Sequence, residues 1–435
     1  MYKWSVFCIR EVLPNGEVLL KSLLTGSVVM LPSVVLSAID CWINDLSQDK
    51  PEGVNDLMGE NALIVSREID EWNEWCNRFL DTRNNKAHIF ILHFLPTIQC
   101  QFRCEYCFEK GINRKTVPMS DIVTKSTFWL EKYLERHPEV DMLRLVFFGG
   151  EPLLREDIVC DALEHFHLLA DRCKIEFHSE LITNGELLNE KLAQTFAVHC
   201  WHKVQITLDG PREVHDRRRH GTHNRPTFDN VVRTIRMLLS TDYIQKVGVR
   251  ISLDSDNADF VPELIRYLAS LGKTDRIDLS LGLTTPSLGV EVSRGSEEFI
   301  ADKTLHVWLI AKSFGFKIPE DFTAGPWCVA VAKHSAVMQP NGFLQKCFCT
   351  VGRPEYNFGH VSNGYDNYTQ DPRFEQFRRT NQCIEEKCAY LPVCGGGCIH
   401  DAIVANNGPA GFSKRFCQRK FVEKMNRGLL LLNYT

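Results

Sequence analysis

Three cysteines near residue 100 have the spacing of a metal site. Cys100, Cys104 and Cys107 lie within TIQCQFRCEYCFEKG, separated by three and then by two residues. Three thiolates this close together can bind one face of a cube-like iron–sulfur cluster, whose usual complement is four cysteines. One iron would then lack a protein ligand and could bind a small molecule. A zinc site that lacks one ligand is the alternative for these residues.

Eight further cysteines form a second group near the carboxyl end: Cys328, Cys347, Cys349, Cys383, Cys388, Cys394, Cys398 and Cys417. Little apolar sequence surrounds them, so we expect bound metal to supply order that a small core cannot. A pair of zinc knuckles is the alternative here, since thiolates also suit zinc. The remaining cysteines are scattered singly, and we expect small buried apolar side chains at Cys8, Cys41, Cys76, Cys160, Cys173 and Cys200.

The composition excludes several classes of protein. The chain has 435 residues, a formal net charge of −5 and 17 cysteines, an odd number that cannot pair completely. The amino-terminal residues MYKWSVFCIREV lack the pattern of a secretion signal, so we expect the reducing cytoplasm. The longest apolar stretch, HIFILHFLPTI, is too short to cross a membrane. The mild acidity argues against a nucleic-acid partner, which usually selects a strongly basic domain.

Six short apolar runs between His88 and Phe316 alternate with amphipathic stretches. The runs are HIFILHFL, LRLVFF, KIEFHSELI, KVQITL, VGVRISL and IDLSLGL. Between them lie helical patterns, such as Val231, Ile235 and Leu238. The alternation predicts βα units and a parallel sheet, open or curled into part of a barrel. We therefore expect an α/β fold in residues 87–316, with the functional residues at the carboxyl ends of the strands.

Two smaller units flank this core in the sequence. In residues 1–86, WSVFCI and EVLLKSL surround the turn signal LPNG and predict a hairpin, and VVMLP follows as a third strand. A helix over 68–80 is expected to bury Trp72, Trp75 and Phe79 in the core, and DTRNNK reads as a linker. Residues 317–435 are rich in glycine and cysteine and form the third unit.

Motifs that follow successive strands resemble those of the radical S-adenosylmethionine (SAM) enzymes. The cysteine triplet follows the first run, FFGGEPLL the second, LITNG the third and ITLDGP the fourth. The segment VHDRRRHGTHNRP also contains the family's HDxxR pattern, His215, Asp216 and Arg219, although a solvated or salt-bridged loop would explain its charges as well. By resemblance, SAM is bound by Tyr106, Gly149, Gly150, Glu151, Pro152, Thr183, Asn184, Asp209 and Arg219.

The resemblance implies a fold and a first chemical step. The fold is a partial (βα)6 barrel like that of a TIM barrel, and a [4Fe–4S] cluster on Cys100, Cys104 and Cys107 reduces bound SAM. The products are methionine and a 5′-deoxyadenosyl radical, which takes a hydrogen atom from the substrate. No residue stands out as a separate catalytic acid or base. An iron–sulfur electron carrier or redox sensor and a zinc-dependent interaction module are the alternatives from other classes, but they do not explain GGEP and TNG.

The carboxyl-terminal cysteines resemble the SPASM extension of radical SAM enzymes. Cys328, Gly342 and Cys347 match its first half, and the later cysteines match its second half, except that Cys383 is displaced from the usual position, Glu385. The resemblance implies one auxiliary [4Fe–4S] cluster on Cys383, Cys388, Cys394 and Cys417. It implies a second auxiliary cluster on Cys328, Cys347 and Cys398. The fourth ligand of that second cluster stays open between Cys349, His334 and an open iron.

Many SPASM enzymes modify peptides, and two details indicate the substrate class. Phe348 replaces the aspartate that sulfatase-maturing relatives carry after Cys347, and LQKCFCTVGRPEYNFGHVSNG is similar to a segment of ribosomal-peptide maturases. Residues 1–86 resemble a winged-helix leader-recognition domain, although a structural cap on the barrel is the alternative.

These details favour a maturase that installs a thioether in a leader-containing precursor peptide. Carbon–carbon or ether macrocycles come second, sulfatase-like oxidation comes third, and a flavodoxin or ferredoxin is the expected reductant. The sequence encodes neither the identity of the peptide, nor the joined atoms, nor the oligomeric state.

Overall fold

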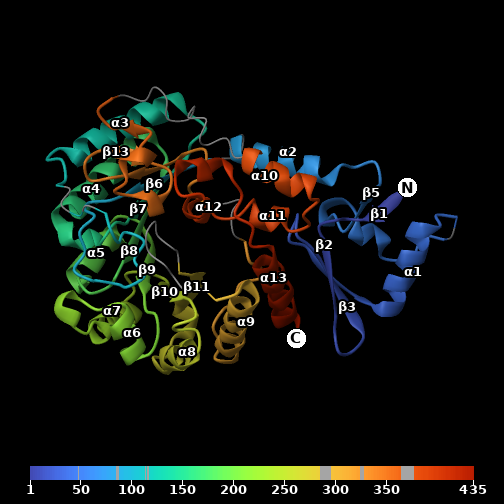
Figure 1. Cartoon of the computed structure of the whole chain (residues 1–435). Coiled ribbons are helices and arrows are strands. Elements are labelled where there is room, and N and C mark those ends of the chain that lie inside the picture. Colours follow the sequence, from blue (N-terminus) through green and yellow to red (C-terminus); the bar gives the residue numbers. More distant parts are fainter. Residues whose placement is uncertain are drawn as a thin grey trace.

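A computed structural model describes residues 1–47, 49–84, 88–112, 114, 117–284, 295–323, 328–363 and 377–435. A parallel sheet covered by helices lies at one side, and an amino-terminal unit (blue in Figure 1) lies at the other. The carboxyl-terminal helices of residues 377–435, orange and red in Figure 1, lie between them.

The central sheet is parallel over its six predicted strands. These are β6 (Ile89–Phe94), β7 (Met142–Phe147), β8 (Glu176–Thr183), β9 (Trp201–Thr207), β10 (Val247–Leu253) and β11 (Ile277–Leu283). They lie side by side in chain order, and each predicted run coincides with one strand. On the β6 side, β12 (Ser335–Met338) adds in parallel, and β13 (Phe343–Gln345) and β14 (Gly359–His360) follow in antiparallel orientation. The parallel α/β fold is therefore confirmed.

Amphipathic helices cover the sheet because each buries one apolar stripe. In α7, the predicted stripe of Val231, Ile235 and Leu238 is fully buried. The helices of this region are α3 (Ile122–Arg136), α4 (Glu156–Cys173), α5 (Glu190–Val198), α6 (Arg212–Arg218), α7 (Phe228–Ser240), α8 (Val261–Ser270) and α9 (Glu297–Ser313). One continuous core joins all of these helices except α6 to the strands, so the carboxyl ends of the strands are held in a packed frame.

The amino-terminal unit contains a hairpin at the predicted turn and the predicted third strand, although the first strand of the hairpin is Cys8–Val12 and not WSVFCI. Its sheet is β2 (Cys8–Val12), β3 (Glu17–Ser22) and β4 (Val28–Pro32), and β1 (Tyr2–Trp4) pairs separately with β5 (Ile64–Ser66). Two helices complete it, α1 (Ser33–Asn44) and α2 (Glu71–Asn84). Helix α2 continues into the predicted linker, of which residues 85–86 lie outside the described part.

The carboxyl-terminal segment packs against both other parts. Its helices are α10 (Phe377–Glu385), α11 (Leu391–Cys394), α12 (Ile399–Ala405) and α13 (Arg419–Tyr434). Phe421 and Met425 of α13 belong to the core of the sheet. On the other side, Phe7, Trp75 and Phe79 share a core with Cys383, Tyr390, Leu391 and Val422. The predicted aromatic stripe thus packs into a core that joins the two ends of the chain, with Trp75 and Phe79 buried and Trp72 partly buried.

The scattered cysteines are less buried than the sequence predicts. Cys41 and Cys200 are exposed, and the other four are only half-buried. The prediction fails at Cys200 because the residue lies in a left-handed turn (φ 53°) between α5 and β9. In the described ranges, no helix is both long and apolar enough to cross a membrane.

Candidate functional site

The cysteine triplet lies beside a cavity at the carboxyl ends of the parallel strands. Cys100, Cys104 and Cys107 line this cavity of about 410 Å³. The predicted residues Tyr106, Gly149, Gly150, Thr183, Asn184 and Arg219 line it too. These residues follow different strands, and the parallel sheet brings them together. We call this space the cofactor cavity.

The three thiols of the triplet stay protonated near neutral pH when no metal is bound. Burial raises the pKa of the Cys100 thiol to about 12 and that of Cys107 to about 11, and it also raises the pKa of Cys104. Because their pKa values are raised, these half-buried thiols ionise only when a metal displaces their protons. Arg114 donates to the Cys107 sulfur over 3.5 Å, and the side-chain amide nitrogen of Asn184 lies 3.8 Å from the Cys100 sulfur.

Two glycines let the backbone close around the segment that precedes the triplet. Gly149 has φ +136°, and a side chain there would meet the backbone of Thr97. A Cβ on Gly150 would lie 2.5 Å from the carbonyl carbon of Gln99 and 2.7 Å from the Ile98 oxygen. The N–H of Glu151 donates to the Gln99 carbonyl over 2.8 Å. The GGEP segment therefore fixes the backbone that leads into Cys100.

Glu151 lies fully buried behind the cavity wall and joins two strand ends. Its carboxylate accepts from the Thr183 hydroxyl and from the Asn184 backbone N–H, each over 2.8 Å, and from the Leu153 N–H over 3.1 Å. Burial raises the pKa of Glu151 to about 7, although these hydrogen bonds act in the opposite direction. Pro152 is likewise buried, in the short 3₁₀ helix η3 (Pro152–Arg155). Glu151 and Pro152 therefore shape the cavity without lining it.

Tyr106 is held by a charged network rather than left free. Its hydroxyl donates to Asp209 and accepts from Arg219 Nη1 over 2.6 Å. Asp209 is fully buried and also accepts from the backbone N–H of Ser252 over 2.7 Å. Asp209 thus orients Tyr106 from behind, while Arg219 presents a positive charge to the cavity.

The basic segment is mostly structural. The Arg218 guanidinium forms two buried hydrogen bonds with Asp254, of 2.9 and 2.7 Å. Arg225 pairs with Glu186 in the same two-pronged way. Asp216 accepts from the backbone N–H groups of Thr227 and Phe228, which begins α7. Of the predicted HDxxR residues, only Arg219 lines the cofactor cavity.

The first auxiliary set of cysteines lies against the same cavity. The pKa of the Cys398 thiol is raised by burial and by the nearby Asp401, Cys347 and Cys328, and Cys349 interacts with the same cysteines. The set therefore consists of Cys328, Cys347, Cys349 and Cys398. Of these, Cys349 lines the cofactor cavity.

His334 is not part of this set. It directly precedes β12, at the amino ends of the strands, and contacts Tyr133. Of the two residues that the sequence offers as a fourth ligand, the structure places Cys349 with the set.

The second auxiliary set also converges. Burial, together with Cys383, Cys388 and Cys417, raises the pKa of the Cys394 thiol to about 12. Arg415 Nη1 lies 3.9 Å from the Cys383 sulfur and pairs with Glu386. The displaced Cys383 therefore reaches its set from α10.

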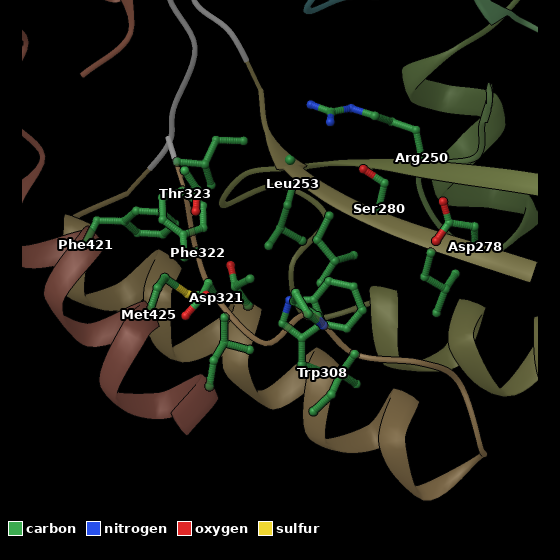
Figure 2. A pocket seen from close by; sticks show the side chains of 18 of the residues that line it. Arg250, Leu253, Asp278, Ser280, Trp308, Asp321, Phe322, Thr323, Phe421 and Met425 are labelled. Carbon is green, nitrogen blue, oxygen red and sulfur yellow. The ribbon is translucent and has the colours of Figure 1, made fainter. Parts of the chain in front are cut away.

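A second, larger cavity adjoins the first. It measures about 730 Å³ and lies between β10, β11, α9 and α13 (Figure 2). Arg250 and Leu283 line both cavities, and Cys398 and Asp401 line the larger one. Trp308, Phe421 and Met425 supply apolar walls, while Asp278 and Ser280 add polar ones.

Sequence reasoning missed several residues that line the cofactor cavity. Among them are His93, Arg250 and Glu109. Neither carboxylate oxygen of Glu109 has a hydrogen-bond partner in the described residues, and burial raises its pKa to about 7. The signal for Glu109 was its place two residues after Cys107. Arg250 gave a signal only as a charge within the apolar strand VGVRISL.

Comparison with known proteins agrees with this geometry. Residues 94–244 match the radical SAM superfamily. The radical SAM cyclopropyl synthase TigE of Paramaledivibacter caminithermalis is 24% identical over 247 residues, which cover 52% of this chain and 51% of TigE. This chain thus spans about half the length of that curated relative.

Two solved structures share the fold. The structure of anSMEcpe with bound AdoMet and the Kp18Cys peptide has a TM-score of 0.62 at 16% identity, over 79% of this chain and 99% of that one. SuiB of Streptococcus suis bound to S-adenosylmethionine has a TM-score of 0.56 at 15% identity, over 96% and 99%.

The matched region contains the whole cysteine triplet, the glycine pair and the Tyr106 network. Three convergent thiols, a backbone cradle without side chains and an enclosed cavity fit a [4Fe–4S] cluster with SAM beside it. Residues 94–244 therefore form a radical SAM domain, and the residues that line its cavity fit the [4Fe–4S] cluster and SAM that this superfamily uses.

Proposed function

We propose that this enzyme is a peptide maturase that forms a cross-link, preferably a thioether, in a ribosomally made precursor. One observation carries the proposal: the set Cys328, Cys347, Cys349 and Cys398 borders both the cofactor cavity and the larger cavity beside it. A peptide in the larger cavity would contact this set and, past Arg250 and Leu283, would reach the cavity that the triplet lines.

The bound groups would supply a 5′-deoxyadenosyl radical and, at the auxiliary cysteines, an acceptor for one electron. Closing a carbon–sulfur bond removes a hydrogen atom from carbon, a proton from the thiol and one electron. The hydrogen atom ends in 5′-deoxyadenosine, the proton in solvent and the electron on the acceptor. The balance therefore requires two redox sites that face one substrate.

The roles of the chain's own residues follow from their positions. The triplet would hold the SAM-binding cluster, and Arg219, 11% exposed, would bind the SAM carboxylate. Asp209 keeps the Tyr106 ring in place for the adenine. Arg250 lies between the cavities, where its charge would hold a peptide carbonyl or carboxylate. The second auxiliary cluster would be bound by Cys383, Cys388, Cys394 and Cys417.

The alternatives differ in the bond that is formed. A carbon–carbon or ether macrocycle needs the same electron balance and the same two redox sites. Sulfatase-like oxidation is less well supported, because Phe348 occupies the position of the aspartate that serves as base, packed against His93 and Phe148. The fold shared with anSMEcpe supports a peptide substrate without choosing among these products.

The amino-terminal unit is proposed to bind the leader of the precursor. The three-stranded sheet offers β4 as an edge, and an extended leader could add to it as a strand. Met30 of β4 is 48% exposed. The fold match to SuiB, which covers 96% of this chain, supports such a unit. We also infer a flavodoxin or ferredoxin as the reductant and the reducing cytoplasm as the compartment, in keeping with 17 cysteines that form no disulfide.

The test uses the reconstituted full-length enzyme with SAM, a reductant and the precursor encoded beside it. We expect 5′-deoxyadenosine and a product about two mass units lighter, with one fewer thiol open to alkylation. A lighter product in which every thiol still reacts would replace the thioether with a carbon–carbon or ether link. If Cys100→Ala forms deoxyadenosine at the rate of the unaltered enzyme, the assignment of the triplet is wrong.

Leader binding is tested with a fluorescent synthetic leader. Met30→Asp should weaken binding of the leader, because strand addition would bury the new charge at the edge of the sheet. Val34→Asp is the control, since Val34 is an exposed apolar residue on the neighbouring helix α1. Equal affinity for both variants would remove β4 as the binding edge.

A further inference from the structure

A further cluster of side chains that can bind metal lies at the amino ends of the sheet strands, opposite the cofactor cavity. His137 directly follows α3, Glu139 lies in the turn before β7, and His334 directly precedes β12. His137 Nδ1 lies 3.1 Å from Glu139 Oε1, and His334 Nε2 lies 3.4 Å from the same oxygen. One ligand atom from each residue lies within 4.8 Å of the other two.

His334 supplies an independent sign of a missing ligand. Its side chain is fully buried, and its Nε2 atom has no hydrogen-bond partner in the described part of the chain. Its other nitrogen, Nδ1, lies 2.6 Å from the Tyr133 hydroxyl. When Nδ1 donates its hydrogen to Tyr133, Nε2 presents a lone pair toward the carboxylate of Glu139. A hydrogen bond that fixes the second nitrogen in this way is usual for histidines that bind metals.

The distances between the ligand atoms indicate the class of metal. Zinc holds nitrogen and oxygen ligands at about 2.0–2.1 Å in a tetrahedron, which places neighbouring ligand atoms about 3.3 Å apart. The two distances to Glu139 Oε1 are 3.1 and 3.4 Å. Two imidazoles with one carboxylate suit zinc and similar transition metals better than magnesium or calcium, which prefer oxygen.

We propose that His137, Glu139 and His334 bind a zinc-class divalent metal ion. The site joins the turn before β7 to the start of the segment that carries the auxiliary cysteines, almost 200 residues later in the chain. Its role is to anchor that segment to the sheet. The site is separate from the radical chemistry and does not depend on the proposed function.

Lys333 competes with the metal for one ligand atom. Its ammonium group lies 3.1 Å from Glu139 Oε1, the oxygen nearest both histidines. A bound metal must weaken or displace this ion pair. Replacing Lys333 with a neutral residue of similar length should therefore strengthen metal binding, an effect that a purely structural ion pair would not produce.

The experiment uses the full-length enzyme with its iron–sulfur clusters reconstituted, so that the cysteines are occupied. The protein is equilibrated with zinc chloride and desalted, and its zinc is measured by mass spectrometry. We expect about one zinc per chain, with zinc X-ray absorption showing nitrogen and oxygen at about 2.0–2.1 Å and no sulfur near 2.3 Å. His334→Gln and Glu139→Gln should lose this zinc. His165→Gln, which alters an exposed pair with Asp161 on α4, should keep it.

Two results would overturn the proposal: zinc retained equally by His334→Gln, or zinc bound to sulfur. Iron content and thermal unfolding without zinc show whether the variants fold. If the ligand variants fail that check, Lys333→Met decides, because it leaves all three ligands intact. Tighter zinc binding by Lys333→Met supports the site, and unchanged or weaker binding refutes it.

Discussion

Gly150→Ala should disturb the cofactor cavity through the backbone alone. The new methyl group would stand 2.5 Å from the carbonyl carbon of Gln99 and 2.7 Å from the Ile98 oxygen. Carbon atoms in good contact are about 3.5–4.0 Å apart, so the two strand ends must separate by roughly 1 Å. The clash cannot be relieved by a side-chain rotation, since the atoms on the other side belong to the backbone.

The displacement falls on the residue before Cys100. It also stretches the hydrogen bond from the Glu151 N–H to the Gln99 carbonyl, now 2.8 Å. A misplacement of about 1 Å at a reacting centre costs on the order of 100-fold in rate. We therefore expect Gly150→Ala to form 5′-deoxyadenosine about 100-fold more slowly, with weaker SAM binding and little change in overall folding.

The assay compares deoxyadenosine formation, SAM affinity and iron content in three proteins. Gly359→Ala is the matched control, because a Cβ there would meet only the Leu344 side chain at an ordinary 3.5 Å. It lies on β14, away from the cofactor cavity. If Gly150→Ala binds SAM and cleaves it as Gly359→Ala does, the close approach at Gly150 does not position the triplet.

Two further predictions concern stability. Burial, with the nearby charge of Arg144, lowers the pKa of His93 to about 4. Below pH 6.5 the unfolded chain therefore binds more protons than the folded chain. The free energy of unfolding falls as the pH drops from about 6.5 to 4, by about 3 kcal/mol in total. Denaturant unfolding at pH 7 and 5 should show a smaller acid loss in His93→Gln, and equal losses would contradict the reasoning. Arg218→Met leaves Asp254 buried and unpaired and should lower the free energy of unfolding by about 3–5 kcal/mol. Arg218→Met with Asp254→Asn should recover much of that loss, and no recovery would show that the pair is not the cause.

The sequence predicted the sheet well because each strand is a separate apolar run. IDLSLGL, for example, became β11 with the same bounds. It also predicted which strand ends border one cavity, since GGEP and TNG are local motifs that follow β7 and β8. The exposure of Cys41 and Cys200 could not be predicted, because a single cysteine has no periodic pattern around it.

The sequence left the fourth auxiliary cysteine open for a physical reason. The sequence offers both Cys349 and His334 as the fourth ligand, and the pairing of β12 with β6 separates them. That pairing places His334 before the strand, whereas Cys349 follows β13 and lines the cofactor cavity. Likewise, the position of Arg250 between two cavities depends on how the carboxyl-terminal segment packs near β10, which no local sequence pattern indicates.

The core shared by the two ends of the chain has a consequence for damage by oxygen. Phe7 and Trp75 pack in one cluster with Cys383 and Leu391, so neither the amino-terminal unit nor the cysteine loop can loosen without exposing the other. If that loop holds iron, oxidative loss of the metal would soften the surface proposed to bind the leader. By reciprocity, a bound leader would protect the metal. An enzyme damaged in this way would release its substrate before attempting chemistry it could no longer complete.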